Sequence, residues 1–204
     1  PHMTGLTSTI FVGVSGASGA VYAQRLLQQL SFRGCRLALC LSDPGLQVVC
    51  HELGITASER DETTRVFLKT SHANATVYHP DDLGAAVSSG TAAPDAVVVC
   101  PCSLSSVAAI ALGTTSTLIH RVGMVALKER RPLVLVPREM PLSSIHLRRL
   151  LEASEAGACV VPAMPGFYGR PQTLQDVVDS VVGKVLTVLG FEHTLYPAWG
   201  GEDA

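Results

Sequence analysis

The chain of 204 residues carries a formal net charge of −2, with 47% hydrophobic and only 16% charged residues. This length suits one domain with a substantial core, and the small acidic charge, without a basic stripe, excludes a typical nucleic-acid-binding protein. No apolar run approaches the ~18 residues that a membrane span requires and no signal peptide is evident, so we expect a cytoplasmic protein without a membrane partner.

The first predicted unit is a strand, a loop rich in glycine and serine, and a helix. Residues 9–14 form a short apolar run, the loop Ser15–Gly19 follows, and residues 20–30 place apolar side chains at helical spacing. This order is typical of the opening turn of a doubly wound fold, where amides at a helix N-terminus bind phosphate. The glycines are spaced GxxGxxG rather than GxGxxG, which argues against NAD, and a tight turn capped by serine remains an alternative.

The next elements are a second strand at 36–41 and a helix over 42–53. Asp43 stands about where an NAD-binding fold keeps its ribose carboxylate, so a dinucleotide remains open, although a plain capping role is the simpler alternative. The polar stretch 59–69 predicts a surface helix, and 76–79 predicts a weak edge strand.

A long irregular loop then leads into a buried strand that is followed by a helix beginning in hydroxyl groups. Residues 96–100 form an unbroken apolar run, typical of a strand covered on both faces, and Pro101 is expected to end it. Ser103 is by residue type the N-cap of a helix that stops at Gly113. Such a terminus is a natural anion site, although a capped helix after a core strand is the plainer alternative.

Helices and strands alternate through the second half of the chain. We expect helices at 118–131, at Ser143 or Ser144 to 155 and at 174–189, and strands at 132–136 and 158–161. Six strands alternating with helices predict a flavodoxin- or Rossmann-like three-layer α/β sandwich with a mostly parallel, doubly wound sheet. We assign residues 4–204 to this one domain, with residues 1–3 as a tag remnant and 191–204 as a tail.

Hydroxyl-rich or charged loops follow four of these strands, at Ser15, Ser42, Ser103 and Arg138. Because the carboxyl ends of parallel strands meet at one edge of a sheet, we expect these loops to converge. Their convergence favours a phosphate-bearing cofactor, and no Ser-His-Asp type of catalytic trio is evident.

The cysteines, histidines and low charge content bear on partners. None of the six cysteines forms a CxxC pair, which is typical of a reduced protein, and the seven histidines lack the spacing of metal ligands. A charged share of 16%, against about 25% in ordinary domains, predicts that part of the surface is buried in a homo-oligomer.

Four segments resemble the UbiX-type flavin prenyltransferases, and the resemblance covers nearly the whole chain: Gly13–Ala20, Val99–Ser103, Leu127–Glu139 and Pro165–Tyr168. The resemblance implies a flavodoxin-like subunit that binds FMN at an oligomer interface, typically in a dodecamer. It implies the joining of a dimethylallyl group from dimethylallyl phosphate to N5 and C6 of reduced FMN, without a metal. The prenylated FMN would then serve a UbiD-type decarboxylase.

The resemblance also implies roles by position. Ser15 and Glu139 would relay protons. The residues that would hold FMN are Gly16, Ala17, Ser18, Ser42, Ser103, Leu104, Ser105, Ser106 and Arg138. The residues that would hold the prenyl phosphate are Arg121, Lys128, Tyr168 and Lys184.

The chain departs from the usual family pattern at three places. Lys184 stands where arginine is usual, which replaces a bidentate phosphate contact by a point charge. Ser116-Thr117 replaces an acidic or amide pair, and Val122-Gly123-Met124 replaces Ala-Ala-Asp. Two alternatives are a non-catalytic FMN carrier and a cysteine decarboxylase, although the latter carry an asparagine that the segment Pro101–Ser106 lacks.

Overall fold

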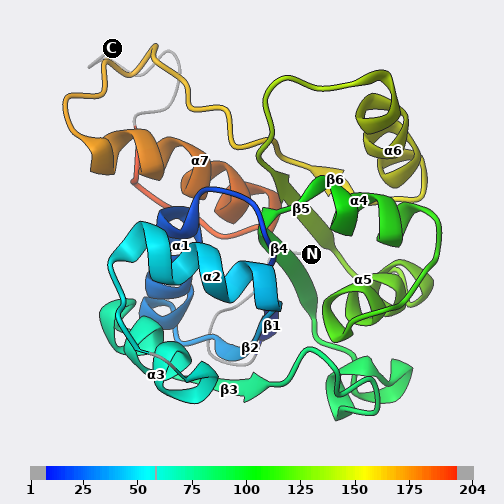
Figure 1. Cartoon of the computed structure of the whole chain (residues 1–204). Helices are drawn as coiled ribbons and strands as arrows, with labels where there is room; N and C mark the ends of the chain where they lie inside the picture. Colours follow the sequence, from blue (N-terminus) through cyan, green and yellow to red (C-terminus); the bar gives the residue numbers. More distant parts are fainter. Residues whose placement is uncertain (1–7, 58, 197–204) are drawn as a thin grey trace.

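Runs of β-branched and other apolar residues form six strands that lie side by side in the order β3-β2-β1-β4-β5-β6 (Figure 1). The computed structural model describes residues 8–57 and 59–196, so the expected tag remnant and the end of the tail lie outside the described residues. The strands are β1 (Thr9–Val14), β2 (Arg36–Leu41), β3 (Ala75–Tyr78), β4 (Ala96–Cys102), β5 (Leu133–Pro137) and β6 (Cys159–Val160). All five pairings between them are parallel.

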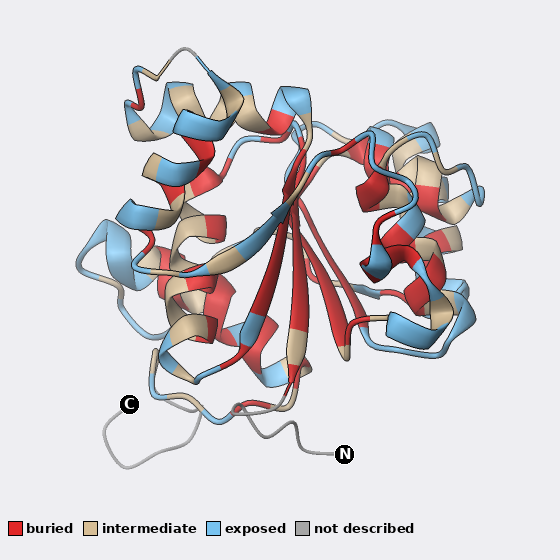
Figure 2. Cartoon of the chain, turned by 90° about the horizontal axis from the view of Figure 1, so that it is seen from below, coloured by how far each residue is buried: buried red, intermediate tan, exposed pale blue. Residues whose placement is uncertain are grey.

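Helices cover both faces of the sheet, and the buried strands lie between the two helical layers (Figure 2). The α-helices are α1 (Ala20–Phe32), α2 (Asp43–Leu53), α3 (Arg60–Thr70), α4 (Leu104–Ala111), α5 (Leu118–Lys128), α6 (Ser144–Glu155) and α7 (Leu174–Val188). Helices α1, α2, α3 and α7 pack into one core cluster, and α4, α5 and α6 pack into the other. The long loop before β4 forms two short 3₁₀ turns, η2 (Ala86–Ser88) and η3 (Gly90–Ala92), and Val87 packs into the second core. The predicted three-layer α/β sandwich is therefore confirmed.

Hydroxyl side chains start several helices, as the sequence predicts. The hydroxyl of Ser42 accepts a hydrogen bond from the Gly45 amide, and Ser143 rather than Ser144 caps α6. Thr173 caps α7 by the same contact to an amide three residues on.

The prediction that Pro101 ends the central strand is wrong, because β4 continues to Cys102. The pairing of β4 with β5 shifts register between Val99 and Cys102, and Cys102 then pairs with Pro137. A residue without an N–H is tolerated at such an irregularity. The carbonyl of Pro101 also accepts the amide of Ser15 at 3.1 Å, which keeps the strand joined to the start of the β1–α1 loop.

The strand order places a topological switch point between β1 and β4. From β1 the chain continues to β2 on one side, and from β4 it continues to β5 on the other. In open α/β sheets, ligands bind in the crevice outside the carboxyl ends of two such strands. The loops that follow β1 and β4 are therefore where the fold itself places a site.

Candidate functional site at the switch point

Ser15 ties the two loops of the switch point together. Its hydroxyl donates to the carbonyl oxygen of Pro101 at 3.2 Å and accepts the amide of Ser103 at 2.8 Å. The side chain is 2% exposed, so these bonds are shielded from water. The hydroxyl of Ser15 is thus held in one place at the base of the crevice.

Several backbone amides at the crevice have no acceptor within the described part of the chain: Gly16, Ser18, Leu104 and Ser105. The amide of Ala17 differs, because it donates to the Ser15 carbonyl at 2.8 Å. Free amides at helix starts, with Arg138 on the next strand's carboxyl end, fit a phosphate-bearing group such as FMN.

Packing against α2 requires a glycine at position 16 of the β1–α1 loop. A Cβ at Gly16 would collide with the Cβ of Pro44, in the first turn of α2. The close approach at this glycine is therefore between the loop and α2, while its amide stays available to a ligand. Asp43, beside Pro44 in the first turn of α2, forms an ion pair with Arg60. The cap of α2 is Ser42, so the capping role expected of Asp43 is wrong.

Sequence reasoning missed Glu52, which reaches the crevice from α2. Its carboxylate accepts the amides of Gly19 at 2.9 Å and Ala20 at 2.7 Å, at the start of α1. Partial burial raises the pKa of Glu52, but the hydrogen bonds from Ser18 and from both amides, with nearby Arg138, outweigh burial and lower it. A carboxylate in the last turn of a helix opposes the helix dipole, and that local misfit is the signal in the sequence.

We expect Glu52→Gln to reduce the free energy of unfolding by about 1 kcal/mol at pH 7, because a capping carboxylate is lost. A pKa lowered by folding contributes stability above the unfolded value of about 4.3, and this contribution disappears as pH falls through the folded value. The difference from wild type should therefore shrink below pH 4 in urea titrations. Glu155→Gln, at the exposed end of α6, is the matched control. A difference that does not change with pH would contradict the assignment.

Arg138 and Glu139 stand on the exposed loop directly after β5. Burial, together with Cys100, raises the pKa of Tyr22 on α1, and the positive charge of Arg138 partly offsets this rise. The positive charge of Arg138 therefore acts on both Tyr22 and Glu52, the two side chains that α1 and α2 place at this edge. One carboxylate oxygen of Glu139 accepts the Met140 amide at 3.0 Å, which holds the carboxylate at the loop.

The structure thus gathers one set of the expected residues at the carboxyl edge of the sheet, and we call it the switch-point group: Ser15, Gly16, Ala17, Ser18, Ser42, Ser103, Leu104, Ser105, Ser106, Arg138 and Glu139. This grouping agrees with the expectation that the loops after four parallel strands converge. The remaining expected residues lie in two other places.

Arg121 and Lys128 line a surface pocket on the outer side of α5, against the loop that contains Gly90. A Cβ built on Gly90 would lie 3.2 Å from the Lys128 ammonium nitrogen. Arg131, three residues on, lies 3.7 Å from Asp95, the residue before β4. Lys128 therefore lies at the amino end of the sheet.

This position separates Lys128 from the switch-point group of its own chain. Strand β5 lies between Lys128 and the switch-point group. Its five residues run from the amino to the carboxyl edge of the sheet and span about 13 Å. Figure 1 shows the 3₁₀ turns at the foot of the molecule with α5 above them, and the loop after β5 at its top. Lys128 and Glu139 of one chain do not share a pocket.

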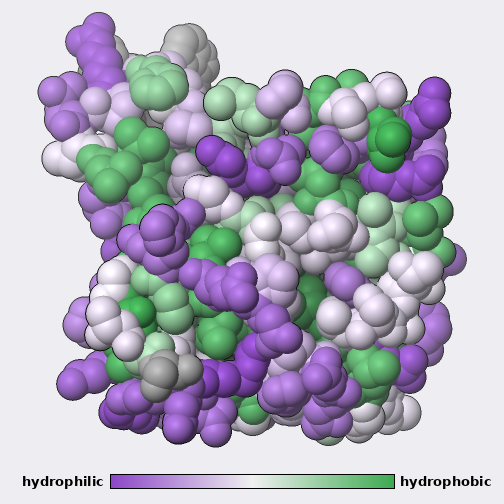
Figure 3. All heavy atoms as spheres, viewed as in Figure 1, coloured by the Kyte–Doolittle hydropathy of each residue, from purple (hydrophilic) through white to green (hydrophobic). Residues whose placement is uncertain are grey.

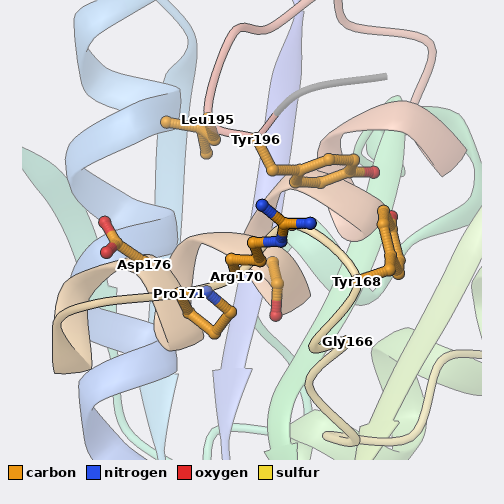
Figure 4. Close-up of a pocket in the computed structure, with 9 residues that line it drawn as sticks. Gly166, Tyr168, Arg170, Pro171, Asp176, Leu195 and Tyr196 are labelled. Atoms are coloured by element: carbon orange, nitrogen blue, oxygen red, sulfur yellow. The ribbon is translucent and has the colours of Figure 1, made fainter. Parts of the chain in front are cut away.

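Tyr168 and Lys184 lie on a third surface, along α7. Tyr168 lines a pocket with Arg170, Ser180 and Tyr196, and Figure 4 shows the Arg170 side chain pointing toward the two tyrosine rings. Lys184 is one helical turn beyond Ser180, on the same side of α7. Lys184 therefore lies beside the pocket of Tyr168 without lining it, and neither residue lines the pocket of Lys128.

Exposed apolar side chains cluster outside these pockets. Met140, Ile145, Leu147 and Leu151, in and before α6, are each more than half exposed. Figure 3 shows apolar groups interrupting the polar surface on the right of the molecule, where Figure 1 places α4 and α6. Several exposed apolar side chains on and beside one helix are typical of surfaces that bind another protein chain.

The cysteines form no disulfide, and the described residues contain neither a metal-binding cluster nor a membrane-spanning helix. All six cysteines are free, and burial raises the pKa of Cys40 and of Cys102 to about 12, so neither is a reactive thiolate at neutral pH. Across residues 8–57 and 59–196, no cluster of histidine, cysteine and carboxylate side chains is arranged to hold a metal. In the same part of the chain, no helix has the length and hydropathy to cross a membrane.

The model of the flavoprotein family matches residues 3–186. The flavin prenyltransferase UbiX of Halalkalibacterium halodurans is 40% identical over 191 residues, covering 94% of this chain and 93% of that protein. UbiX of Pseudomonas aeruginosa is 41% identical over 196 residues, with the same two coverages.

Solved structures agree with these relatives. AnUbiX (PadA1), in complex with FMN and dimethylallyl pyrophosphate, superposes with a TM-score of 0.84 at 34% identity, covering 95% of this chain and 98% of that one. A dodecameric FMN-dependent UbiX-like decarboxylase from Escherichia coli O157:H7 gives 0.81 at 39% identity, covering 95% and 99%. The cysteine decarboxylase TvaF gives 0.61 at 20% identity, covering 90% and 98%, which shows a shared fold alone.

Proposed function

Because the chain belongs to the UbiX-type flavin prenyltransferases of the flavoprotein family, we propose that it binds reduced FMN at the switch point and transfers a dimethylallyl group to N5 and C6 of the flavin. The donor is dimethylallyl phosphate, and the prenylated FMN is passed to a UbiD-type decarboxylase. The observation that carries the proposal is the set of amides without acceptors beside Arg138 at one sheet edge. These groups favour a phosphate-bearing ligand at the place where the fold opens a crevice.

Residues of the chain supply the charges that such a transfer requires. Reduced FMN, when bound, supplies the nucleophilic ring that takes up the allyl group. The phosphate gains negative charge as it leaves, and Lys128, Lys184 and the Tyr168 hydroxyl stabilise that charge. Ring closure onto C6 consumes the double bond of the allyl group: one of its carbons takes up a proton, the other bonds to C6, and the proton on C6 then leaves. The exposed carboxylate of Glu139 would accept that ring proton, and Ser15 would belong to the same proton relay. Three cationic side chains, Lys128, Lys184 and Arg121, neutralise the phosphate, which in other enzymes is the role of a metal ion. No metal is therefore proposed.

The position of Lys128 implies that one chain does not complete the site. Lys128 lies at the amino end of the sheet, away from the switch-point group of its own chain, and Arg121 lines the same exposed pocket on a surface open to a neighbour. We therefore propose a homo-oligomer, built as a dodecamer, in which α5 of one copy supplies these cations to the crevice of another. The exposed apolar side chains around α6 provide surface for such an assembly.

An anaerobic incubation tests the reaction. Purified protein is mixed with reduced FMN and either dimethylallyl phosphate or dimethylallyl diphosphate, and the mass of the released flavin is measured. A flavin heavier by one dimethylallyl unit is the expected result with the monophosphate. Bound but unmodified FMN with both donors would indicate the carrier instead, and a protein that binds no FMN would contradict the site.

The lysine at position 184 gives a gain-of-function test of donor binding. We expect Lys184→Arg to lower KM for dimethylallyl phosphate about three- to tenfold, because a guanidinium binds phosphate in a bidentate manner. The value of kcat should change little. Lys69→Arg, in the exposed last turn of α3, is the control. An unchanged KM would remove Lys184 from the donor site.

A further inference from the structure

His120 on α5 makes a side-chain bridge to α4. Its Nε2 atom lies 3.2 Å from the hydroxyl oxygen of Ser106, and its Nδ1 atom lies 3.1 Å from the hydroxyl oxygen of Ser116. Both ring nitrogens are therefore engaged, one on each side of the partly buried imidazole. No role for His120 follows from the sequence pattern or from the switch-point group.

The bridge continues into the switch point through a chain of short contacts. The hydroxyl of Ser103 donates to that of Ser106 at 3.0 Å, and the Ser103 oxygen accepts the Ser106 amide at 3.2 Å. The hydroxyls of Ser103 and Ser105 are also 3.0 Å apart. The amide of Ser103 finally donates to Ser15 at 2.8 Å. His120 is thus connected to the hydroxyls at the start of α4 and to the base of the crevice.

The number of protons on each group sets the donor and acceptor roles in this series of hydrogen bonds. Each serine hydroxyl has one proton, and Ser103 directs its proton at Ser106, so the proton of Ser106 is left for the Nε2 atom of His120. The imidazole then carries its own proton on Nδ1 and donates it to Ser116. This tautomer is assigned from the network. Burial lowers the pKa of His120, which agrees with a neutral ring.

We infer that His120 is a positioning residue for the flavin site, which holds the Ser106 hydroxyl through Nε2 and thereby aligns Ser103 and the first turn of α4. This inference rests on the proposed function. Helix α4 has only eight residues, and the amides of Leu104 and Ser105 in its first turn have no acceptor within the described residues. A free rotation of Ser106 would remove the hydroxyl contact that orients the Ser103 side chain and leave the contact from the Ser106 amide. The bond to His120 therefore matters for FMN affinity and not for the chemical step.

Two conservative variants separate the two bonds of the imidazole. The side-chain amide of His120→Gln reaches about as far as Nε2 and retains the contact to Ser106, whereas that of His120→Asn reaches only as far as Nδ1. We expect His120→Gln to bind FMN within about twofold of wild type, and His120→Asn to bind about tenfold more weakly. The KM for the prenyl donor and kcat at saturating FMN should not change in either variant. Affinity is measured by anaerobic titration, with a thermal melt of each variant.

The controls make each outcome decisive. Ser116→Ala leaves the imidazole in place and removes only the Nδ1 partner, so we expect less than about a threefold loss of FMN affinity. His51→Ala, an exposed histidine on α2, should have no effect. The inference is overturned if glutamine and asparagine at 120 behave alike, or if Ser116→Ala is as weak as His120→Asn. A wild-type protein that binds no FMN would instead overturn the proposed function.

Discussion

Replacing Glu139 by glutamine is expected to lower kcat about 10²–10³-fold, because an amide does not accept the proton that must leave the flavin ring. The substitution keeps the shape of the side chain and the oxygen that accepts the Met140 amide at 3.0 Å. The loop after β5 therefore stays in place, and FMN affinity should remain within about twofold of wild type. Single-turnover formation of the prenylated flavin, followed by mass under anaerobic conditions, measures the loss.

Two control variants show whether the loss of kcat is specific to the proton acceptor. Glu155→Gln removes an exposed carboxylate at the end of α6, away from the crevice, and should leave kcat unchanged. Arg138→Ala should instead weaken FMN binding, because it removes a cation at the crevice. A Glu139→Gln enzyme with wild-type kcat would show that another group takes the proton. A variant that no longer binds FMN would give Glu139 a binding role.

The strands and the helix starts were predictable because their determinants are local. An unbroken apolar run such as Val97–Val99 specifies a doubly covered strand. A serine or threonine before a helical pattern specifies a cap, as at Ser103 and Thr173. The extension of β4 past Pro101 was not predictable, because it depends on the register of the neighbouring β5.

Contacts between distant segments account for what the sequence did not reveal at the site. Glu52 reaches amides 33 and 32 residues away, so its unfavourable place at the end of a helix marks the residue but does not name its partners. The bridge from His120 to Ser106 spans 14 residues and requires α4 and α5 to pack side by side. Residue types predict which groups have the right chemistry, and only the packing of helices decides which of them meet.

The separation of Lys128 from Glu139 also depends on packing and was not predictable from the sequence. The resemblance placed both residues in one site, and the fold places them at opposite ends of β5. Sequence order does not state whether two residues act within one chain or across two. A site assembled from two copies agrees with both the resemblance and the fold. Two different inactive chains can complement one another in such a site, but not in a site within one chain.

Two inactive variants should therefore restore one another. Lys128→Ala alone is expected to lose about 10²-fold or more in rate, because a cation facing the leaving phosphate is missing. When Lys128→Ala and Glu139→Gln chains are co-expressed with different tags and purified together, about a quarter of the sites in a random assembly combine both wild-type groups. The mixed oligomer should then show about a quarter of wild-type activity per site.

The matched control is a mixture of Glu139→Gln with Arg138→Ala, two residues that are adjacent on the loop after β5. Because both act from the same chain, every crevice in that mixture carries one defect, and activity should stay at the level of the single variants. Recovery in the first mixture alone places Lys128 in a crevice built from two copies. Absence of recovery in both mixtures, with mixed oligomers verified by their two tags, would confine the site to one chain and would require α5 to move relative to β5.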